Sequence, residues 1–283
     1  MPPWTTLAVL EWTTQKFQAA QIAGARLEAQ VLLAHALSCK RIELYTNFDQ
    51  PLSEPELAAY RDLIRRRLAG QPLAYLVGEH EFWSLPFWID DSVLVPRADT
   101  ETLVEVALAR RGRAPGRLLD LCTGSGAIAV SLLHTVPELQ GIATDVSPAA
   151  VALAGRNAER NGVAERLELR QGDLWAPVRE ERFDVIVSNP PYVLSAVIDT
   201  LSAEVRAEPR LALDGGADGL AFYDRIVGEA AAHLAPGGWL FLEHGFDQAD
   251  AVAARMSAAG FLEVETAMDL AKHPRVTSGR LPG

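Results

Sequence analysis

The second half of the chain alternates between short apolar runs and helical patterns, and this alternation restricts the fold more than any other feature. An apolar run of five or six residues is typical of a buried strand, whereas apolar residues three and four apart are typical of a helix. Their alternation predicts an α/β fold with a doubly wound, Rossmann-like parallel sheet and helices on both faces. We expect seven strands, at 117–121, 140–144, 166–171, 183–187, 238–243, 261–266 and 275–281. We expect helices near 126–134, 148–161, 219–234 and 247–259. The last two strands are close enough in sequence to pair antiparallel.

The first 75 residues have only the helical pattern and predict a small helical bundle. Apolar residues follow helical spacing between Ala29 and Leu37, and again at Leu57, Ile64 and Leu68. Ser53, followed by two acids and a proline, is a good helix start.

An aromatic-rich segment separates these two regions. Residues 81–84 and 86–89 flank a short break, which predicts a hairpin whose aromatic side chains lie mostly in the core or at a domain interface. Asp99 or Thr100 is then expected to cap a helix that ends near Ala109. We therefore divide the chain into a helical domain at 1–75, a hairpin linker at 76–98 and a larger domain at 99–283.

Charge and cysteine usage narrow the functional classes. The 283 residues have a net charge of −11, which disfavours non-specific binding to nucleic acid. We interpret the arginines at 65–67 as part of a solvated helix face. Cys39, Cys122 and the scattered histidines form no metal-binding pattern, so we expect a reduced, cytoplasmic setting and no metal. The sequence predicts no signal peptide and no membrane span.

Asn189, Pro190, Pro191 and Tyr192 directly follow the fourth expected strand. Two prolines remove two backbone donors and fix two φ angles, so the turn is stiff and non-helical. The Asn amide and the proline-flanked carbonyls can hydrogen-bond an NH2 group, while the Tyr ring can stack on its planar π-system. The turn indicates a receptor for an amide or an exocyclic base amine, with a merely rigid turn as the structural alternative.

A second motif follows the first strand of the sheet. Asp120 lies near the end of that strand, and residues 122–126 (Cys-Thr-Gly-Ser-Gly) lead into a helix. Glycines let the backbone approach a ligand, and helix N-termini offer unpaired N–H groups. The next strand ends at Asp145, whose carboxylate can hold both hydroxyls of a ribose, and Asp173 follows the third. A glycine-rich turn with a surface acid is the structural alternative.

Two cofactors fit this loop. Gly124, Gly126 and Ala129 satisfy a loose dinucleotide fingerprint, which indicates NAD. An acid at Asp120 can instead meet a methionyl ammonium or orient the loop, and Asp173 can hydrogen-bond an adenine amino group. Because these acids and the Asn-Pro-Pro-Tyr turn are not expected of a dehydrogenase, we expect S-adenosylmethionine, with S-adenosylhomocysteine as the product.

Several long stretches are similar to one family. They are the helical N-terminal region and residues 78–88, 94–101, 120–129, 188–192, 242–245 and 275–280. Over almost its whole length the chain resembles class I S-adenosylmethionine-dependent methyltransferases of the HemK/PrmC type. That family methylates N5 of the glutamine in the Gly-Gly-Gln motif of class 1 peptide-chain release factors, and so acts on translation termination.

The resemblance implies roles for individual residues. The catalytic residues would be Asn189, Pro190 and Tyr192, which with Pro191 would also hold the substrate glutamine. The cofactor-binding residues would be Asp120, Cys122, Thr123, Gly124, Ser125, Gly126, Asp145, Asp173, Leu174 and Asn189. Arg97 and Glu101 would border the cofactor pocket, with a surface ion pair between them as the structural alternative. The helical domain would dock the release factor, without direct contact to nucleic acid, and the enzyme would be a monomer. For His244 we expect a structural hydrogen bond, with a catalytic role as the alternative.

Three residues depart from the pattern of the relatives. Ala98 stands where relatives often have proline, which would loosen the turn before the following helix. Cys122 replaces a glycine, so its backbone is expected to fit without a positive φ. Leu174 stands where some relatives have an aromatic residue, so stacking beside the adenine would be weaker.

Three other functions stay open. A sister family methylates a glutamine of a large-subunit ribosomal protein, but residues 99–101, 243–245 and 275–280 favour the release-factor enzymes. An adenine N6 methyltransferase of nucleic acid would use the same turn on a flipped base, against which the acidic net charge argues. A non-catalytic scaffold that senses S-adenosylmethionine would not need both motifs intact.

Overall fold

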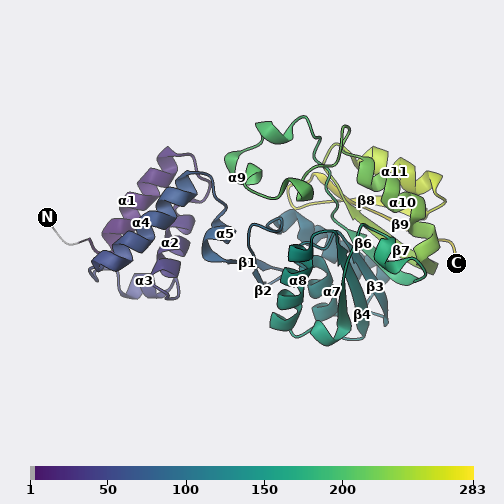
Figure 1. The fold of residues 1–283 in the computed structure, drawn as a ribbon, viewed down its shortest axis with the longest axis horizontal. Coiled ribbons are helices and arrows are strands. Elements are labelled where there is room, and N and C mark those ends of the chain that lie inside the picture. The colour runs from purple at the N-terminus through teal and green to yellow at the C-terminus, as the bar shows by residue number, and fades with distance from the viewer. Residues whose placement is uncertain (1–3) are drawn as a thin grey trace. The chain divides into compact units, whose positions relative to one another are not determined.

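The structure is a computed structural model that describes residues 4–283, and these residues form two compact units (Figure 1). The first unit contains the chain up to Gly78 together with Ser202–Ala207. The second unit contains Glu79–Leu201 and Glu208–Gly283. The expectation that the N-terminus has no signal peptide concerns in part residues 1–3, which lie outside the described residues.

The first unit is helical. Its helices are α1 (Thr6–Ala19), α2 (Ala25–Ala36), α3 (Glu43–Thr46), α4 (Glu54–Leu68), α5 (Leu73–Val77) and the short α9 (Ala203–Arg206). Phe17, Leu32 and Leu33 have no exposed surface and form the centre of its core. The start of α4 at Ser53 is confirmed, because Ser53 and Glu56 form a reciprocal capping box.

The interpretation of 65–67 as a solvated face is wrong for Arg67. This side chain is 6% exposed and donates to Glu28 and to Glu204, both in the same unit. Its neighbour Leu68, expected on the buried side by its spacing, is instead 44% exposed. A guanidinium that meets two carboxylates can be buried at a helix position where spacing alone favours leucine.

The second unit begins with the predicted hairpin, formed by β1 (Glu79–Phe82) and β2 (Leu85–Trp88). Trp83 and Ser84 connect the strands and have φ of +54° and +57°, the left-handed conformation that two-residue hairpin turns require. Phe82 and Phe87 are buried as expected, whereas Trp88 is 37% exposed and lies under the Arg160 guanidinium.

A seven-stranded sheet forms the centre of the second unit, and all seven predicted strands are present. They are β3 (Gly116–Leu121), β4 (Leu139–Asp145), β5 (Leu167–Gln171), β6 (Phe183–Ser188), β7 (Leu234–Glu243), β8 (Leu262–Met268) and β9 (Pro274–Arg280). Their order is β5-β4-β3-β6-β7-β9-β8. The first five strands in this order are parallel, and β9 pairs antiparallel with both β7 and β8.

Helices flank both faces of this sheet. They are α6 (Glu101–Arg111), α7 (Ala127–Thr135), α8 (Pro148–Arg160), α10 (Ala221–His233) and α11 (Ala249–Ala258). Helices α6, α7 and α8 contact one another in sequence order, and α10 contacts α11. In Figure 1 the helices α7 and α8 lie apart from the pair α10 and α11, with strands of the sheet between them. The parallel strands direct all their carboxyl ends to one edge of the sheet.

The start of α6 agrees with the prediction in position, because Thr100 is its N-cap residue, but differs in how the helix is capped. A short 3-10 turn (Ala98–Thr100) precedes the helix, and neither Asp99 nor Thr100 caps it with a side chain. Asp99 instead lies 3.3 Å from the Arg275 guanidinium, and the Thr100 hydroxyl faces Asn189. Both side chains therefore interact with residues distant in sequence rather than with the first backbone N–H groups of the helix.

Candidate active site

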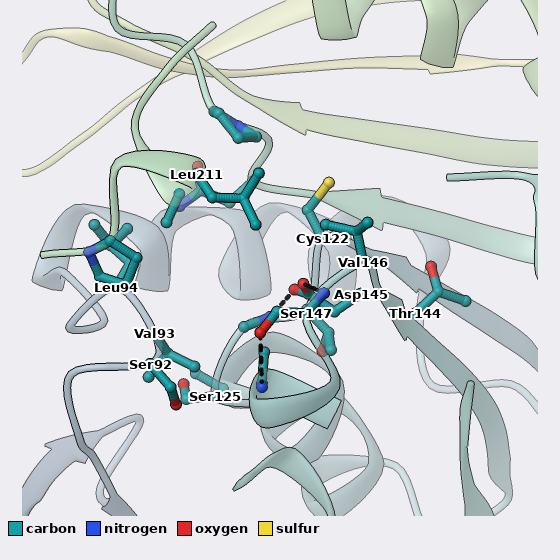
Figure 2. A pocket seen from close by; sticks show the side chains of 18 of the residues that line it. Ser92, Val93, Leu94, Cys122, Ser125, Thr144, Asp145, Val146, Ser147 and Leu211 are labelled. Atoms are coloured by element: carbon teal, nitrogen blue, oxygen red, sulfur yellow. Dashed lines mark hydrogen bonds between the residues drawn. The ribbon is translucent and has the colours of Figure 1, made fainter. Parts of the chain in front are cut away.

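A pocket lies at the carboxyl ends of the parallel strands β3, β4, β5 and β6. Most predicted cofactor residues line it: Cys122, Thr123, Gly124, Ser125, Asp145, Asp173, Leu174 and Asn189. Asp120 and Gly126 lie outside the lining. Residues far away in sequence, such as Val93 and Leu211, complete the wall, and Figure 2 shows them around the same pocket as Cys122 and Asp145.

The loop 122–126 turns sharply between β3 and α7. The expectation that Cys122 fits without a positive φ is wrong, because its φ is +60°. Two hydrogen bonds hold the turn: the Thr123 N–H donates to the Thr144 carbonyl at 3.0 Å, and the Gly126 N–H donates to the Thr123 carbonyl at 2.9 Å. These bonds fix the path of the backbone, so the cysteine adopts the conformation that a glycine would adopt freely.

Asp120 holds the loop 122–126 in place through its side chain. Its side chain is fully buried, and Oδ2 accepts from the Thr123 hydroxyl at 2.6 Å and from the Ala129 N–H at 3.3 Å. Burial raises the pKa of Asp120 to about 7, although both hydrogen bonds oppose the rise. Of the two roles considered for this acid, the geometry favours orientation of the loop.

Asp145 connects the end of β4 to the same loop. Oδ2 accepts from the Gly124 N–H and Oδ1 from the Ser147 N–H, each at 2.9 Å. Figure 2 shows the bond between Asp145 and Ser147 beside the pocket. Burial raises the pKa of Asp145, and the backbone N–H groups oppose this. Each oxygen keeps a further lone pair, so the carboxylate can still accept two hydroxyl donors.

Asp173 and Leu174 follow β5. Leu174 has φ of +46° and is buried, so its side chain packs in the core beside the pocket. Asp173 is exposed, and its Oδ2 accepts from the Arg225 guanidinium at 2.7 Å. Its other oxygen has capacity for a further donor.

The Asn-Pro-Pro-Tyr turn follows β6 and reaches the pocket through Asn189 and Pro191, whereas Pro190 and Tyr192 lie outside its lining. The Tyr192 carbonyl accepts from Gln248 Nε2 at 3.0 Å. A Cβ on Gly215 would lie 2.6 Å from the Tyr192 Cα, so only glycine allows this close approach. Burial raises the pKa of Tyr192 to about 12. These contacts hold the turn in place at its Pro191–Tyr192 end.

Two residues at this turn were not expected to belong to the site from the sequence. Thr100 Oγ1 accepts from Asn189 Nδ2 at 3.4 Å. Glu243, at the end of the adjacent strand β7, is 1% exposed. Burial raises its pKa to about 7, while hydrogen bonds from Thr100 and Asn189 and the charge of Arg275 oppose the rise. Only the position of Glu243 at a strand end could have indicated it in the sequence.

Asn157 is a third residue that sequence reasoning missed. It lies on α8 with no exposed surface, and its Nδ2 donates to the Ser125 carbonyl at 2.9 Å and to the Trp88 carbonyl at 3.0 Å. Its Oδ1 accepts from the Trp88 N–H at 2.6 Å. One buried amide thus ties the loop 122–126 to the hairpin, and an asparagine on the apolar face of a predicted helix is the signal that could have found it.

The remaining predicted residues have structural partners. His244 is fully buried, with Nδ1 2.9 Å from the Gly245 carbonyl and Nε2 2.9 Å from Thr277 Oγ1, in agreement with the structural hydrogen bonding expected. Arg97 pairs with Glu208 and Glu101 accepts from the Trp83 N–H, so the two do not pair with each other.

Within residues 4–283, no three or more His, Cys, Asp or Glu side chains are grouped so that they could hold a metal ion. No helix in the same range is long and apolar enough to cross a membrane.

Comparison with known proteins gives consistent results over the whole chain. Residues 8–78 match the PrmC N-terminal domain and residues 98–216 match the methyltransferase small domain. A release factor glutamine methyltransferase of Geobacter sulfurreducens is 47% identical, with 98% of this chain and 97% of the relative covered. One of Xylella fastidiosa is 44% identical over 91% of this chain and 94% of the relative. A solved methyltransferase structure from Pyrococcus furiosus is similar in fold, with a TM-score of 0.55, 21% identity and coverage of 77% and 98%.

The fold and the pocket define a class I S-adenosylmethionine-dependent methyltransferase: β9 is inserted antiparallel in the sheet, and the pocket lies at the carboxyl ends of the parallel strands. The identity to curated relatives over nearly full length is more specific than the fold. The chain belongs to the release factor glutamine methyltransferase family.

Proposed function

We propose that the protein transfers a methyl group from S-adenosylmethionine to the side-chain amide nitrogen (N5) of the glutamine in the Gly-Gly-Gln motif of class 1 peptide-chain release factors. The observation that carries this proposal is the meeting of two motifs at one pocket: Asn189 of the turn and Asp145 with the loop of β3. The names of the curated relatives support the choice of substrate.

The polar groups that line the pocket suit S-adenosylmethionine. Asp145 would accept the ribose hydroxyls and Asp173 the adenine amino group, with Leu174 beside the ring. The loop 122–126, oriented by Asp120, would lie against the methionyl part. An added Cβ on Gly124 would meet no protein atom within 4 Å, so this pocket-lining position leaves room for a ligand. When bound, S-adenosylmethionine supplies an electrophilic methyl group on a sulfonium.

Positioning is the main task of the protein in this reaction. An amide nitrogen is a poor nucleophile because its lone pair is delocalised, and orientation can lower such a barrier by up to about 7–11 kcal/mol. Asn189 Oδ1 and the Pro190 carbonyl would each accept one N–H of the glutamine, and Tyr192 would stack on the amide plane. These acceptors bind more strongly as the nitrogen becomes positive in the transition state. The methylated amide is then acidic enough to lose a proton without a strong base.

The first test offers labelled S-adenosylmethionine with a class 1 release factor, the ribosomal-protein candidate or duplex DNA, and locates the methyl group by mass spectrometry of digests. Label on the Gly-Gly-Gln glutamine supports the proposal. Label on another acceptor only would move the substrate, and absence of label despite cofactor binding would favour the scaffold.

Asn189→Ala tests the residue that carries the proposal. We expect intact folding and cofactor binding, with nearly all methyl transfer lost, because one N–H of the glutamine then lacks its acceptor. The exposed Asn47→Ala is the matched control for the loss of one asparagine amide. Near-normal turnover of Asn189→Ala would contradict the assignment of Asn189 as an acceptor for the glutamine amide.

We further propose that the first unit docks the release factor. Deletion of residues 1–72 should then raise the KM for the release factor while leaving cofactor affinity unchanged. An equal effect on both would indicate a structural role of these helices instead.

A further inference from the structure

Glu243 is a buried carboxyl whose hydrogen-bonding capacity is only partly filled. Its side chain is 1% exposed, and Oε2 has no hydrogen-bond partner among the described residues. The backbone of the residue is held firmly, because the Tyr223 hydroxyl donates to its carbonyl at 2.9 Å. Burying a carboxyl with unfilled hydrogen-bonding capacity is costly, so such a group calls for an explanation beyond packing.

The sheet register places Glu243 beside Asn189. Strands β6 and β7 are parallel, and Ser188 pairs with Leu242, so Asn189 and Glu243 are the next residues along each strand. Thr100 joins them from the turn before α6, where its oxygen accepts from Asn189 Nδ2 at 3.4 Å. Glu243, Thr100 and Asn189 thus form a cluster that contains the proposed substrate acceptor, Asn189.

We propose that Glu243 is a positioning residue that fixes the orientation of the Asn189 amide, both directly and through Thr100, so that Asn189 Oδ1 faces the substrate glutamine. This inference rests on the proposed function of Asn189. A carboxylate can only accept hydrogen bonds, whereas a hydroxyl has one hydrogen to donate and two lone pairs. The Thr100 hydroxyl therefore donates to Glu243 and turns its lone pairs to Asn189. Only the NH2 end of the Asn189 amide can meet those lone pairs, so the oxygen end points outward.

The direction of this chain of hydrogen bonds depends on the charge of Glu243. Hydrogen bonds from Thr100 and Asn189 favour the ionised form. The charged and titratable groups around it are Arg275 on β9, Asp99 before α6, Tyr192 after β6 and Tyr223 on α10. Arg275 favours the ionised carboxylate and Asp99 disfavours it.

Loss of that charge removes the preference. A neutral carboxyl, or a glutamine at this position, can donate to Thr100 as well as accept from it. The hydroxyl is then free to turn and donate to Asn189 Oδ1, which lets the amide flip. A flipped amide presents its NH2 group to the NH2 group of the substrate, and a buried donor left without an acceptor costs about ten- to a hundredfold in transfer rate.

The test is Glu243→Gln, measured by single-turnover methyl transfer to the release factor between pH 5.5 and pH 8.5. We expect a ten- to hundredfold loss at pH 8, and convergence with the wild type at pH 5.5, because burial raises the pKa of Glu243 to about 7 and the wild type loses the same charge there. The exposed Glu229→Gln is the matched control and keeps the wild-type profile. A loss of equal size at every pH would overturn the proposal, because a merely structural role predicts it.

A second readout needs no substrate and so separates this inference from the proposed function. The chain has four asparagines, so selective 15N labelling gives few side-chain amide signals and the Asn189 signal is assigned by its loss in Asn189→Ala. In the wild type we expect this signal to shift with a midpoint near pH 7, and in Glu243→Gln to be independent of pH in this range. A pH-independent signal in the wild type would overturn the inference even if the release factor is methylated. The expected shift without methylation would instead refute the proposed substrate.

Two Thr100 variants keep the proposal testable if Glu243→Gln does not fold. Thr100→Ser retains the hydroxyl and should keep transfer within a few-fold of the wild type. Thr100→Val has almost the same shape but no hydroxyl, and should lose about tenfold or more. Equal activity of the serine and valine variants would contradict a role of the hydroxyl.

Discussion

Replacing Asp120 with asparagine should change how stability depends on pH, by an amount set by the burial of this carboxyl. Burial is the main cause that raises its pKa from 3.8 to about 7. Between these values the unfolded chain releases a proton that the folded chain keeps, so stability falls by about 1.4 kcal/mol for each pH unit gained. The whole window is worth about 4 kcal/mol, and its part above pH 5 about 3 kcal/mol.

The Asp120→Asn variant lacks this dependence, because its side chain is neutral throughout. Its amide oxygen can still accept from the Thr123 hydroxyl and the Ala129 N–H, so the loop keeps both bonds. Any cost of the new NH2 group is the same at every pH. The free energy of unfolding of the variant, minus that of the wild type, should therefore rise by about 3 kcal/mol from pH 5 to pH 8.

The assay is equilibrium unfolding in urea at both pH values without cofactor. Contributions from other titrating groups occur in both proteins and cancel in the difference. The exposed Asp91→Asn is the control for removal of one acidic side chain. A difference that stays constant from pH 5 to pH 8 would refute the reasoning, because Asp120 would then already be ionised in the folded protein at pH 5.

Two further predictions concern stability. Cys122→Gly should be more stable than Cys122→Ala by about 1 kcal/mol, since both lose the thiol but only alanine keeps a Cβ at a φ of +60°. Urea unfolding measures which variant is more stable, and a more stable alanine variant would contradict the left-handed backbone. Arg67→Met should destabilise the helical unit by about 3 kcal/mol, because it leaves Glu28 without its partner. The double variant with Glu28→Leu should recover most of this loss, and equal thermal unfolding of wild type and Arg67→Met would refute the buried pair.

Much of the second unit could be predicted because its signals are local. Each buried strand is a short apolar run ended by polar or glycine residues, so the predicted strands are confirmed. Their ends differ by between one residue, as with 183–187 against Phe183–Ser188, and four residues, as with 238–243 against Leu234–Glu243. Asp145 and Asn189 could be selected for the same reason, since both directly follow such a run. Parallel strands then bring their ends to one edge without further information.

The remaining features depend on partners that are distant in the sequence. Arg67 is buried because Glu28 and Glu204 meet it, and neither is visible from the pattern of α4. The sequence around Thr100 predicts a helix cap, but in the structure β6 places Asn189 opposite its hydroxyl. The hairpin turn at Trp83 and Ser84 has two positive φ angles without the glycine or asparagine that normally indicates them. Tertiary contacts override local preference at each of these positions.

The two prolines of the Asn-Pro-Pro-Tyr turn also bear on how a turnover ends. Because neither proline has a backbone N–H, the proposed glutamine site offers acceptors where the amide binds: Asn189 Oδ1 and the Pro190 carbonyl. An unmodified amide has two N–H groups for these two acceptors, whereas a monomethylated amide has one. The product therefore leaves one acceptor unpaired and should bind about ten- to a hundredfold more weakly than the substrate. The same mismatch favours product release and makes a second methylation of one glutamine unfavourable.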